Sequence, residues 1–325
     1  MADRASEQIG VVALNLGGPE RLEEVEPFLV NLFSDREIIR LSPFPFLQKP
    51  IARRIAHRRA PKSREAYRRI GGGSPLARIT AEQCQALAEA LAQVGSFEVR
   101  PAMRYWHPFA SQTLSDLHEK GIHRIVALPL YPHYSIATNG SSLLDLRRAA
   151  AAGPAAFTIE EIRSWPEQPD YVACLAENIL QTAAVFREPP TVVYSAHSLP
   201  VKFIREGDPY VEELEKTIAR VEAITSLRGH LCYQSRSGPV RWLEPSTPDM
   251  LARLASEGCR QVLMVPLSFV SDHVETDYEI DILYRELAEG LGMGFARTKS
   301  LNTQPKFITA LRELVLAACR RRNWL

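Results

Sequence analysis

Apolar positions along the chain follow two alternating patterns. Short runs rich in β-branched and aromatic residues have the composition of buried strands, and they cover residues 9–16, 97–105, 123–131, 191–196, 229–235 and 260–269. Between them, segments such as 81–94 and 209–224 place an apolar residue every three or four positions, which is typical of amphipathic helices. Strands that alternate with helices predict an α/β protein whose parallel sheets are covered by helices.

The chain also repeats its own pattern, although the identity between the copies is low. The segment GIHRIVALPLYPHYSIAT, from Gly121, aligns with GCRQVLMVPLSFVSDHVET, from Gly258. Two further pairs follow in the same order: VVALNLGGP with TVVYSAHSLP, and MRYWHP with YQSRSGP. The repetition predicts two similar doubly wound domains, 1–150 and 151–325, whose parallel sheets face each other across a cleft. The small-residue run AAAAGP at 149–154 marks the expected boundary.

Composition and charge narrow the class of protein. A chain of 325 residues with 46% hydrophobic content can bury a substantial core. The 39 Lys and Arg residues nearly balance the 38 Asp and Glu residues, so the overall charge gives no reason to expect a nucleic-acid partner. The start, MADRASEQIG, has no apolar core, and no run of about 18 apolar residues occurs. We therefore expect no signal peptide or spanning helix, and a cytoplasmic protein whose scattered cysteines are buried thiols.

The stretch TVVYSAHSLP (191–200) ends a β-branched run on small hydroxyl residues, which places His197 at the carboxyl end of a strand. Open α/β sheets bind ligands at that edge, although a histidine that caps a backbone carbonyl would fit the same stretch. In SDHVETDYEID, Asp272, Glu275 and Glu279 are expected on one face of a helix. Carboxylates there are also ordinary partners of a helix dipole. Together, imidazole and carboxylates suit a loosely held divalent metal and proton uptake near neutral pH.

Residues 40–75 combine an apolar tip with a basic segment. Phe44, Phe46 and Leu47 lie between prolines, in a sequence that is not expected to form a regular element and should leave aromatic rings near solvent. Residues 49–69 then hold nine Lys or Arg against the single Glu65. The combination predicts reversible contact with an anionic membrane surface, which would place the protein on the inner face of the membrane. A nucleic-acid patch and an ordinary solvated helix are the alternatives.

Six stretches have the order and spacing of signature motifs: LNLGGP (14–19), YRRIGGGSP (67–75), MRYWHP (103–108), YSAHSLP (194–200), GDPY (207–210) and FVSDHVETDYEID (269–281). Over nearly its whole length the chain therefore resembles the ferrochelatase family. The resemblance implies a chelatase-like fold and a lyase that inserts ferrous iron into protoporphyrin IX, the last step of heme biosynthesis. Iron and porphyrin would be substrates, and no permanently bound cofactor is implied.

The resemblance also implies roles for particular residues. His197 matches the residue proposed to accept pyrrole protons, to bind the metal, or both, and Glu275 matches its acidic partner and second metal ligand. Positions that relay protons or metal in the family correspond to Asp272, His273 and Glu279. Substrate-binding positions correspond to Leu16, Arg59, Tyr67, Ser74, Arg104, Tyr105 and Trp242.

Three departures refine these expectations. Leu283 stands where some members have an acid, which shortens the acidic row. The chain ends LAACRRRNWL with only Cys319, unlike the cysteine-rich tail of animal members, so no iron–sulfur cluster is expected. Leu16 differs from the tyrosine that coproporphyrin-using relatives place nearby, which favours protoporphyrin IX. A chelatase for coproporphyrin or cobalt remains the alternative enzyme, and a two-domain solute-binding protein is an alternative of a different class.

Overall fold

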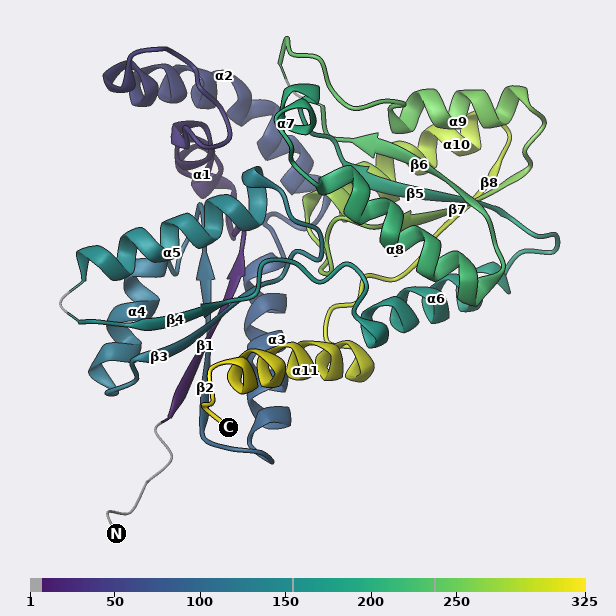
Figure 1. Cartoon of the computed structure of the whole chain (residues 1–325). Helices are drawn as coiled ribbons and strands as arrows, with labels where there is room; N and C mark the ends of the chain where they lie inside the picture. The colour runs from purple at the N-terminus through teal and green to yellow at the C-terminus, as the bar shows by residue number, and fades with distance from the viewer. Residues whose placement is uncertain (1–7, 154, 237) are drawn as a thin grey trace. The chain divides into compact units, whose positions relative to one another are not determined.

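The computed structural model describes residues 8–325 of the chain, except for positions 154 and 237. The chain divides into two compact units, of which the first runs to Ser164 and includes Asn302–Leu325, and the second is Trp165–Leu301. Each unit contains a four-stranded sheet with parallel pairings and covering helices (Figure 1). The α/β class and the repeated architecture are confirmed.

The first sheet has the strand order β2-β1-β3-β4. Its strands are β1 (Ile9–Asn15), β2 (Phe97–Met103), β3 (Arg124–Pro129) and β4 (Thr158–Glu161). Every residue of β1 is buried, because β1 has a strand on each side and helices over its faces. Asn15 and the loop that follows it therefore leave the sheet at the carboxyl edge of its most buried strand.

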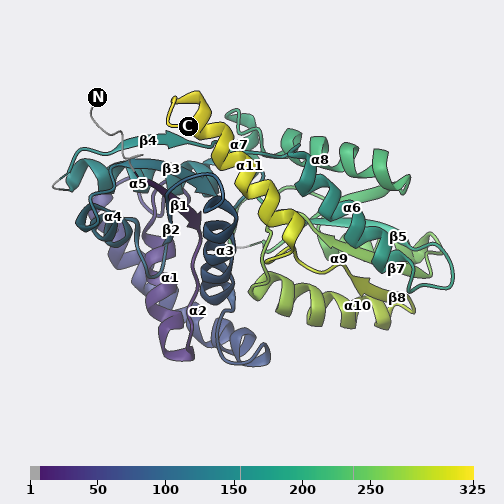
Figure 2. The same ribbon diagram turned by 90° about the horizontal axis from the view of Figure 1, so that it is seen from below.

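Six α-helices belong to the described part of the first unit: α1 (Val25–Ser34), α2 (Gln48–Arg69), α3 (Leu76–Leu91), α4 (Ala110–Glu119), α5 (Ser141–Ala152) and α11 (Pro305–Arg321). Short helical turns are η1 (Leu22–Glu24), η2 (Pro45–Leu47) and η3 (Ile136–Gly140). In α2, Ala52, Ala56 and Ala60 recur every four residues and are fully buried. These small side chains let α2 lie close against α1 (Figures 1 and 2), and they leave the basic residues of α2 on the solvent side.

The second sheet repeats the pattern with the order β6-β5-β7-β8. Its strands are β5 (Thr191–His197), β6 (Gly229–Gln234), β7 (Gln261–Pro266) and β8 (Gly294–Arg297). The helices are α6 (Pro169–Ala183), α7 (Val201–Arg205), α8 (Tyr210–Thr225), α9 (Thr247–Ser256), the π-helix η4 (Glu275–Tyr284) and α10 (Arg285–Gly290). Figure 2 shows this sheet between α6 and α8 on one face and α9 and α10 on the other. Both faces are thus covered, as in a doubly wound unit.

The structure adds two strands that the pattern of apolar residues does not reveal. Thr158–Glu161 (β4) and Gly294–Arg297 (β8) have four residues each, lie at sheet edges and contain no fully buried position. An edge strand covered on part of its surface does not need a continuous apolar run. Such strands are therefore poorly visible in a sequence.

The observed division differs from the expected boundary between residues 150 and 151. Because β4 pairs with β3, the first unit extends to Ser164. Because α11 packs against α3, residues 302–325 also belong to that unit rather than to the second. Position 154, at the end of the small-residue run, lies outside the described residues.

The apolar tip is more regular than its prolines suggest. Pro45 occupies the first position of the helical turn η2, where a proline is tolerated because its missing N–H would have no helical partner. The expectation of no regular element was therefore wrong for Pro45–Leu47. Across the residues that the structure describes, no helix combines the length and the apolar character needed to span a bilayer.

Candidate active site

His197 is the last residue of β5, and its backbone is held on both sides. Its N–H donates to Ser268 Oγ at 2.7 Å, and its carbonyl accepts from the Tyr210 hydroxyl at 3.0 Å. Ser268 and Tyr210 are joined by a further hydrogen bond of 2.6 Å. The strand end is therefore fixed, and the imidazole projects from a rigid support.

The imidazole is paired with a carboxylate rather than with a backbone carbonyl. His197 Nδ1 lies 3.0 Å from Glu275 Oε1 and 2.9 Å from Glu275 Oε2. The reading of His197 as a carbonyl cap is thus wrong. Glu275 is the first residue of η4, so the contact joins the end of β5 to the start of that helix.

The two groups hold each other in their charged forms. Desolvation lowers the pKa of His197, but the charge and hydrogen bond of Glu275, together with a smaller effect of the Glu279 charge, raise it by more, so the pKa lies above its ordinary value. Desolvation likewise raises the pKa of Glu275, whereas the His197 charge and hydrogen bonds from His197 and Gln234 bring it well below its ordinary value. Glu275 is therefore ionised at neutral pH, and His197 is a stronger base than a free imidazole.

A second carboxyl group, that of Glu279, lies one turn further along η4 and behaves in the opposite way. Desolvation and the charge of Glu275 raise the pKa of Glu279, although Ser235 Oγ donates to its carboxylate at 2.6 Å. The Tyr284 hydroxyl donates to the same oxygen at 3.3 Å. Two acidic groups in one helix thus have pKa values that are moved apart, an arrangement that often separates acid and base roles.

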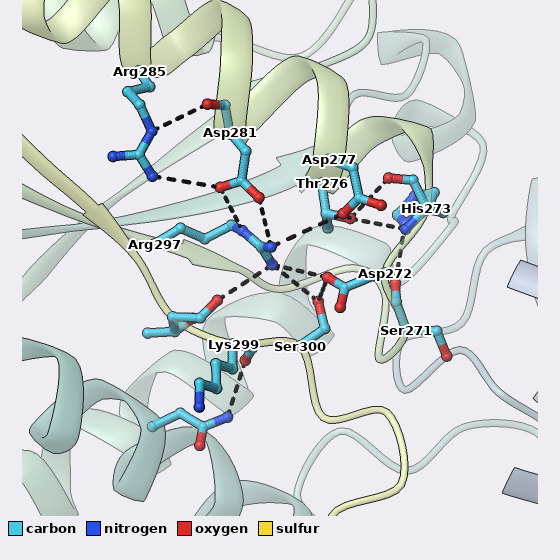
Figure 3. A network of polar contacts seen from close by, with 12 residues as sticks. Ser271, Asp272, His273, Thr276, Asp277, Asp281, Arg285, Arg297, Lys299 and Ser300 are labelled. Atoms are coloured by element: carbon cyan, nitrogen blue, oxygen red, sulfur yellow. Dashed lines mark hydrogen bonds and ion pairs between the residues drawn. The ribbon is translucent and has the colours of Figure 1, made fainter. Parts of the chain in front are cut away.

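Asp272 does not share a helix face with these residues, because η4 begins only at Glu275 and is wound as a π-helix. Its Oδ1 instead accepts hydrogen bonds from Arg297 Nη1 at 3.0 Å and Ser300 Oγ at 2.6 Å (Figure 3). The expectation of a single acidic face was wrong for Asp272. A role for Asp272 in a relay stays a prediction.

Arg297 is the centre of this separate acidic cluster. Its Nε and Nη2 bind the two oxygens of Asp281 at 2.8 and 2.7 Å, and its Nη2 lies 4.0 Å from Asp277 Oδ1 (Figure 3). Burial and the charge of Asp272 raise the pKa of Asp277 to about 6. Arg297, at the end of β8, therefore joins the segment before η4 to the middle of that helix.

His273 is almost completely buried beside the pair. Its Nδ1 lies 3.1 Å from the Ser271 carbonyl, and its ring packs on Phe269 with 4.3 Å between centroids. Among the described residues, its Nε2 has no hydrogen-bond partner. Desolvation lowers the pKa of His273, which favours the neutral form. In the part of the chain that the structure describes, no group of three or more His, Cys, Asp or Glu is arranged to hold a metal ion.

In the first unit, the structure joins Arg104 and Tyr105 through Asp35, which sequence reasoning missed. Asp35 Oδ2 accepts from Arg104 Nη2 at 2.8 Å, from the Tyr105 hydroxyl at 2.7 Å and from Ser141 Oγ at 2.7 Å. Arg104 also contacts Ser141 through Nε at 2.8 Å and Asp145 through Nη1 at 3.3 Å. The carboxylate of Asp35 is thus buried among donors, and the charge of Arg104 holds its pKa below the ordinary value although burial opposes this.

The other residues expected to bind substrate lie at several places. Leu16 follows β1 and is half-buried, and the loop after it packs on Ser74, since a Cβ on Gly18 would lie 2.7 Å from Ser74 Oγ. In α2, Tyr67 is buried, whereas Arg59 is exposed over the Phe33 ring. Trp242, in the second unit, is half-buried. Leu16 and Ser74 therefore belong to loops in contact.

Comparison with known proteins identifies the family. A sequence model described as Ferrochelatase matches residues 8–319. The chain belongs to the ferrochelatase family. The ferrochelatase of Desulfotalea psychrophila is 56% identical over 308 residues, which cover 94% of this chain and 96% of that protein. The ferrochelatase of Geotalea uraniireducens is 50% identical, with 95% of this chain and 97% of the relative covered. The resemblance to the ferrochelatase family that the six motifs indicate is confirmed.

Solved structures show the same fold at low sequence identity. SirB from Bacillus subtilis with Fe3+ matches with a TM-score of 0.56 and 12% identity, over 97% of both chains. CbiX, the terminal enzyme of siroheme biosynthesis in denitrifying bacteria, matches with a TM-score of 0.51 and 14% identity, over 96% of this chain and 99% of that one. The chelatase-like fold is thereby confirmed.

Asp35 provides a test of the polar cluster in the first unit. Asp35→Asn removes a buried charge that faces Arg104, so we expect a loss of roughly 3 kcal/mol in the free energy of unfolding. Asp145→Asn is the matched control, because Asp145 pairs with the same guanidinium but is more exposed, and it should cost less than about 1 kcal/mol. Urea denaturation measures both, and equal losses would contradict the central place given to Asp35.

Proposed function

We propose that this chain is a metal chelatase that inserts ferrous iron into protoporphyrin IX and forms protoheme, the terminal step of heme biosynthesis. Family membership over residues 8–319 and the identity to ferrochelatases support this reaction. The observation that carries the chemistry is the contact of His197 Nδ1 with both oxygens of Glu275. In the usual classification this metal insertion is a lyase reaction.

In its neutral form, the imidazole of His197 is the proton acceptor in this proposal. A porphyrin must lose two pyrrole protons before its nitrogens bind a metal, and a base is most effective when its pKa lies near the working pH. Within the described part of the chain, the hydrogen bonds of the His197 ring are those of Nδ1 to Glu275, so Nε2 is the atom offered to a substrate. Glu275 makes that nitrogen more basic through its charge.

The same pair supplies candidate ligands for the incoming iron. A carboxylate and an imidazole suit a divalent first-row metal. A cation at Glu275 would compensate the charge that raises the pKa of His197, and the imidazole would then release its proton more readily. Affinity rises from iron to copper in this series, so supply of the metal decides much of the choice. Asp272, His273 and Glu279 are the residues we propose to relay protons or metal.

We propose no permanently bound cofactor and no iron–sulfur cluster. Cluster ligands are cysteine thiolates that act together, and the five cysteines of this sequence, at positions 84, 174, 232, 259 and 319, have no paired spacing. Iron and porphyrin are therefore substrates in this proposal.

Mixing the purified protein with protoporphyrin IX and ferrous iron without oxygen tests the reaction. The absorption spectrum should change from that of the free porphyrin to that of heme. His197→Ala should reduce turnover by roughly 10²- to 10⁴-fold, because general base catalysis acts in the transition state, while porphyrin binding stays nearly intact. Parental turnover in this variant would remove His197 from the mechanism, and parallel reactions with coproporphyrin or cobalt separate the alternative chelatases.

The pH dependence of Glu275→Gln tests the coupling between the two groups. Without the charge of Glu275, only the smaller influence of the Glu279 charge opposes desolvation of His197, so the pKa of His197 should fall and the neutral imidazole should persist to lower pH. We expect the acid limb of the profile of kcat/KM against pH to move to lower pH, while maximal turnover falls. A variant with the parental acid limb would show that Glu275 does not control the basicity of His197.

We further propose that this cytoplasmic protein attaches reversibly to the inner face of an anionic membrane through Phe44, Phe46 and the basic helix α2. The side chains of Phe44 and Phe46 are 58% and 74% exposed, and their rings lie 5.8 Å apart. Leu47 is half-buried, and the exposed basic residues on α2 include Arg53, Arg54, Arg58 and Arg59. Attachment there would let an apolar porphyrin enter, and heme leave, with little exposure to water.

Sedimentation with anionic liposomes tests this attachment. Full burial of each Phe would contribute roughly 1.5–3 kcal/mol and each basic residue about 1 kcal/mol, which suits reversible binding that weakens at high salt. Phe44→Ser with Phe46→Ser should reduce the bound fraction. Val185→Ser with Ile224→Ser, which also removes exposed apolar side chains, is the matched control and should not. Undiminished binding of the Phe variant would exclude the aromatic tip as the contact.

A further inference from the structure

Gln234 links the His197–Glu275 pair to a buried serine. It is the last residue of β6 and lies directly beside His197 in the parallel register. Its Nε2 donates to Glu275 Oε2 at 3.1 Å, and its Oε1 accepts from Ser195 Oγ at 2.5 Å. Gln234 and Ser195 are both buried, at 4% and 2% exposure. The amide is therefore held at both ends, away from water.

The charge of Glu275 sets the direction of this arrangement. An ionised carboxylate accepts hydrogen bonds but cannot donate them, so the amide nitrogen of Gln234 must face it. The amide oxygen then faces Ser195, whose hydroxyl must donate. Thr247 Oγ1 lies 3.3 Å from Ser195 Oγ, and Thr247 is fully buried. The buried side chains of Thr247 (α9), Ser195 (β5) and Gln234 (β6) thus form a row. At its end, the amide N–H of Gln234 donates to Glu275.

We propose that Gln234 is a positioning residue that keeps the Glu275 carboxylate turned toward His197, and that Ser195 acts through Gln234 by fixing its amide. This inference rests on the proposed function, in which Glu275 and His197 handle the proton and the metal. The amide of Gln234 is held in one orientation by its hydrogen bonds to Glu275 Oε2 and from Ser195 Oγ, so it can hold that carboxylate oxygen in place beside His197.

A merely structural role for Gln234 makes a different prediction. If the amide only satisfied buried partners, its loss would lower the thermal stability of the protein and leave metal use unchanged. If Ser195 acts through Gln234, its removal should have no further effect on metal use once Gln234 is gone.

The experiment compares Gln234→Leu, Ser195→Ala and the double variant, with Zn2+ and protoporphyrin IX as substrates. Gln234→Leu keeps the volume of the side chain and removes both amide groups. Because a hydrogen bond to a charged group is lost, we expect kcat/KM for the metal to fall roughly tenfold to a hundredfold, while KM for porphyrin stays parental. Ser195→Ala should show a smaller loss of the same kind, and the double variant should match Gln234→Leu. The affinity for Zn2+ without porphyrin, measured by calorimetry, should fall most in Gln234→Leu and the double variant and less in Ser195→Ala.

Thr217→Val is the matched control, because it removes a buried hydroxyl that donates to the Pro166 carbonyl at 2.6 Å in the same unit. It should lower Tm and leave metal use parental. Parental metal kinetics in Gln234→Leu, or additive losses in the double variant, would overturn the inference. A crystal structure of Gln234→Leu tests the inference without a measurement of turnover. Glu275 should no longer contact His197 Nδ1 through both carboxylate oxygens, and an unchanged contact would also overturn the inference. Failure of the parent to metallate porphyrin would instead contradict the proposed function.

Discussion

The contact between His197 Nδ1 and the Glu275 carboxylate joins the end of β5 to the start of η4, and the pKa values of both groups and of Glu279 depend on it. Neighbouring parallel strands end at the same edge of a sheet, so the end of β5 and the segment that follows β7 meet there. Removing water from either group alone would favour its neutral form. Each charge instead compensates the desolvation of the other, which keeps a carboxylate ionised and an imidazole basic in a partly buried site.

The acidic residues around this pair differ in whether a basic side chain neutralises their charge. Arg297 compensates Asp272 and Asp281 through short contacts, and the resulting cluster holds the chain on both sides of the first turn of η4. Glu279 has only hydroxyl donors from Ser235 and Tyr284 in the described contacts. Firm ion pairs therefore support the helix, while an acid whose pKa is raised remains next to the His197–Glu275 pair. The division separates acids that Arg297 neutralises from an acid that hydroxyl groups alone contact in the described structure.

The sequence predicts those parts of the structure that depend on local pattern. Central strands, amphipathic helices and the strand-end position of His197 follow from apolar spacing and from the change to small hydroxyl residues. The partners of Asp35 and Asp272 do not, because Arg104 and Arg297 are distant along the chain and an acidic residue looks alike whether it is solvated or paired. The π winding of η4 and the edge strands β4 and β8 also escape the pattern, since both depend on tertiary packing. Gln234 is visible in YQSRSGP, but its role requires the register that sets it beside His197.

A substrate metal must be bound and then given up, and the donors around Glu275 suit that requirement. An ion held by a full set of anionic ligands would be stabilised as a resident cofactor, and its transfer to a porphyrin would become slow. In the proposed function, one ionised carboxylate and one imidazole would form the core of the metal site, and the adjacent carboxyl of Glu279 has a raised pKa. When Glu279 is protonated, the negative charge available to a cation falls. Proton uptake at that residue would therefore weaken the hold on the metal, and the protons that leave a porphyrin are available at the moment when release is required.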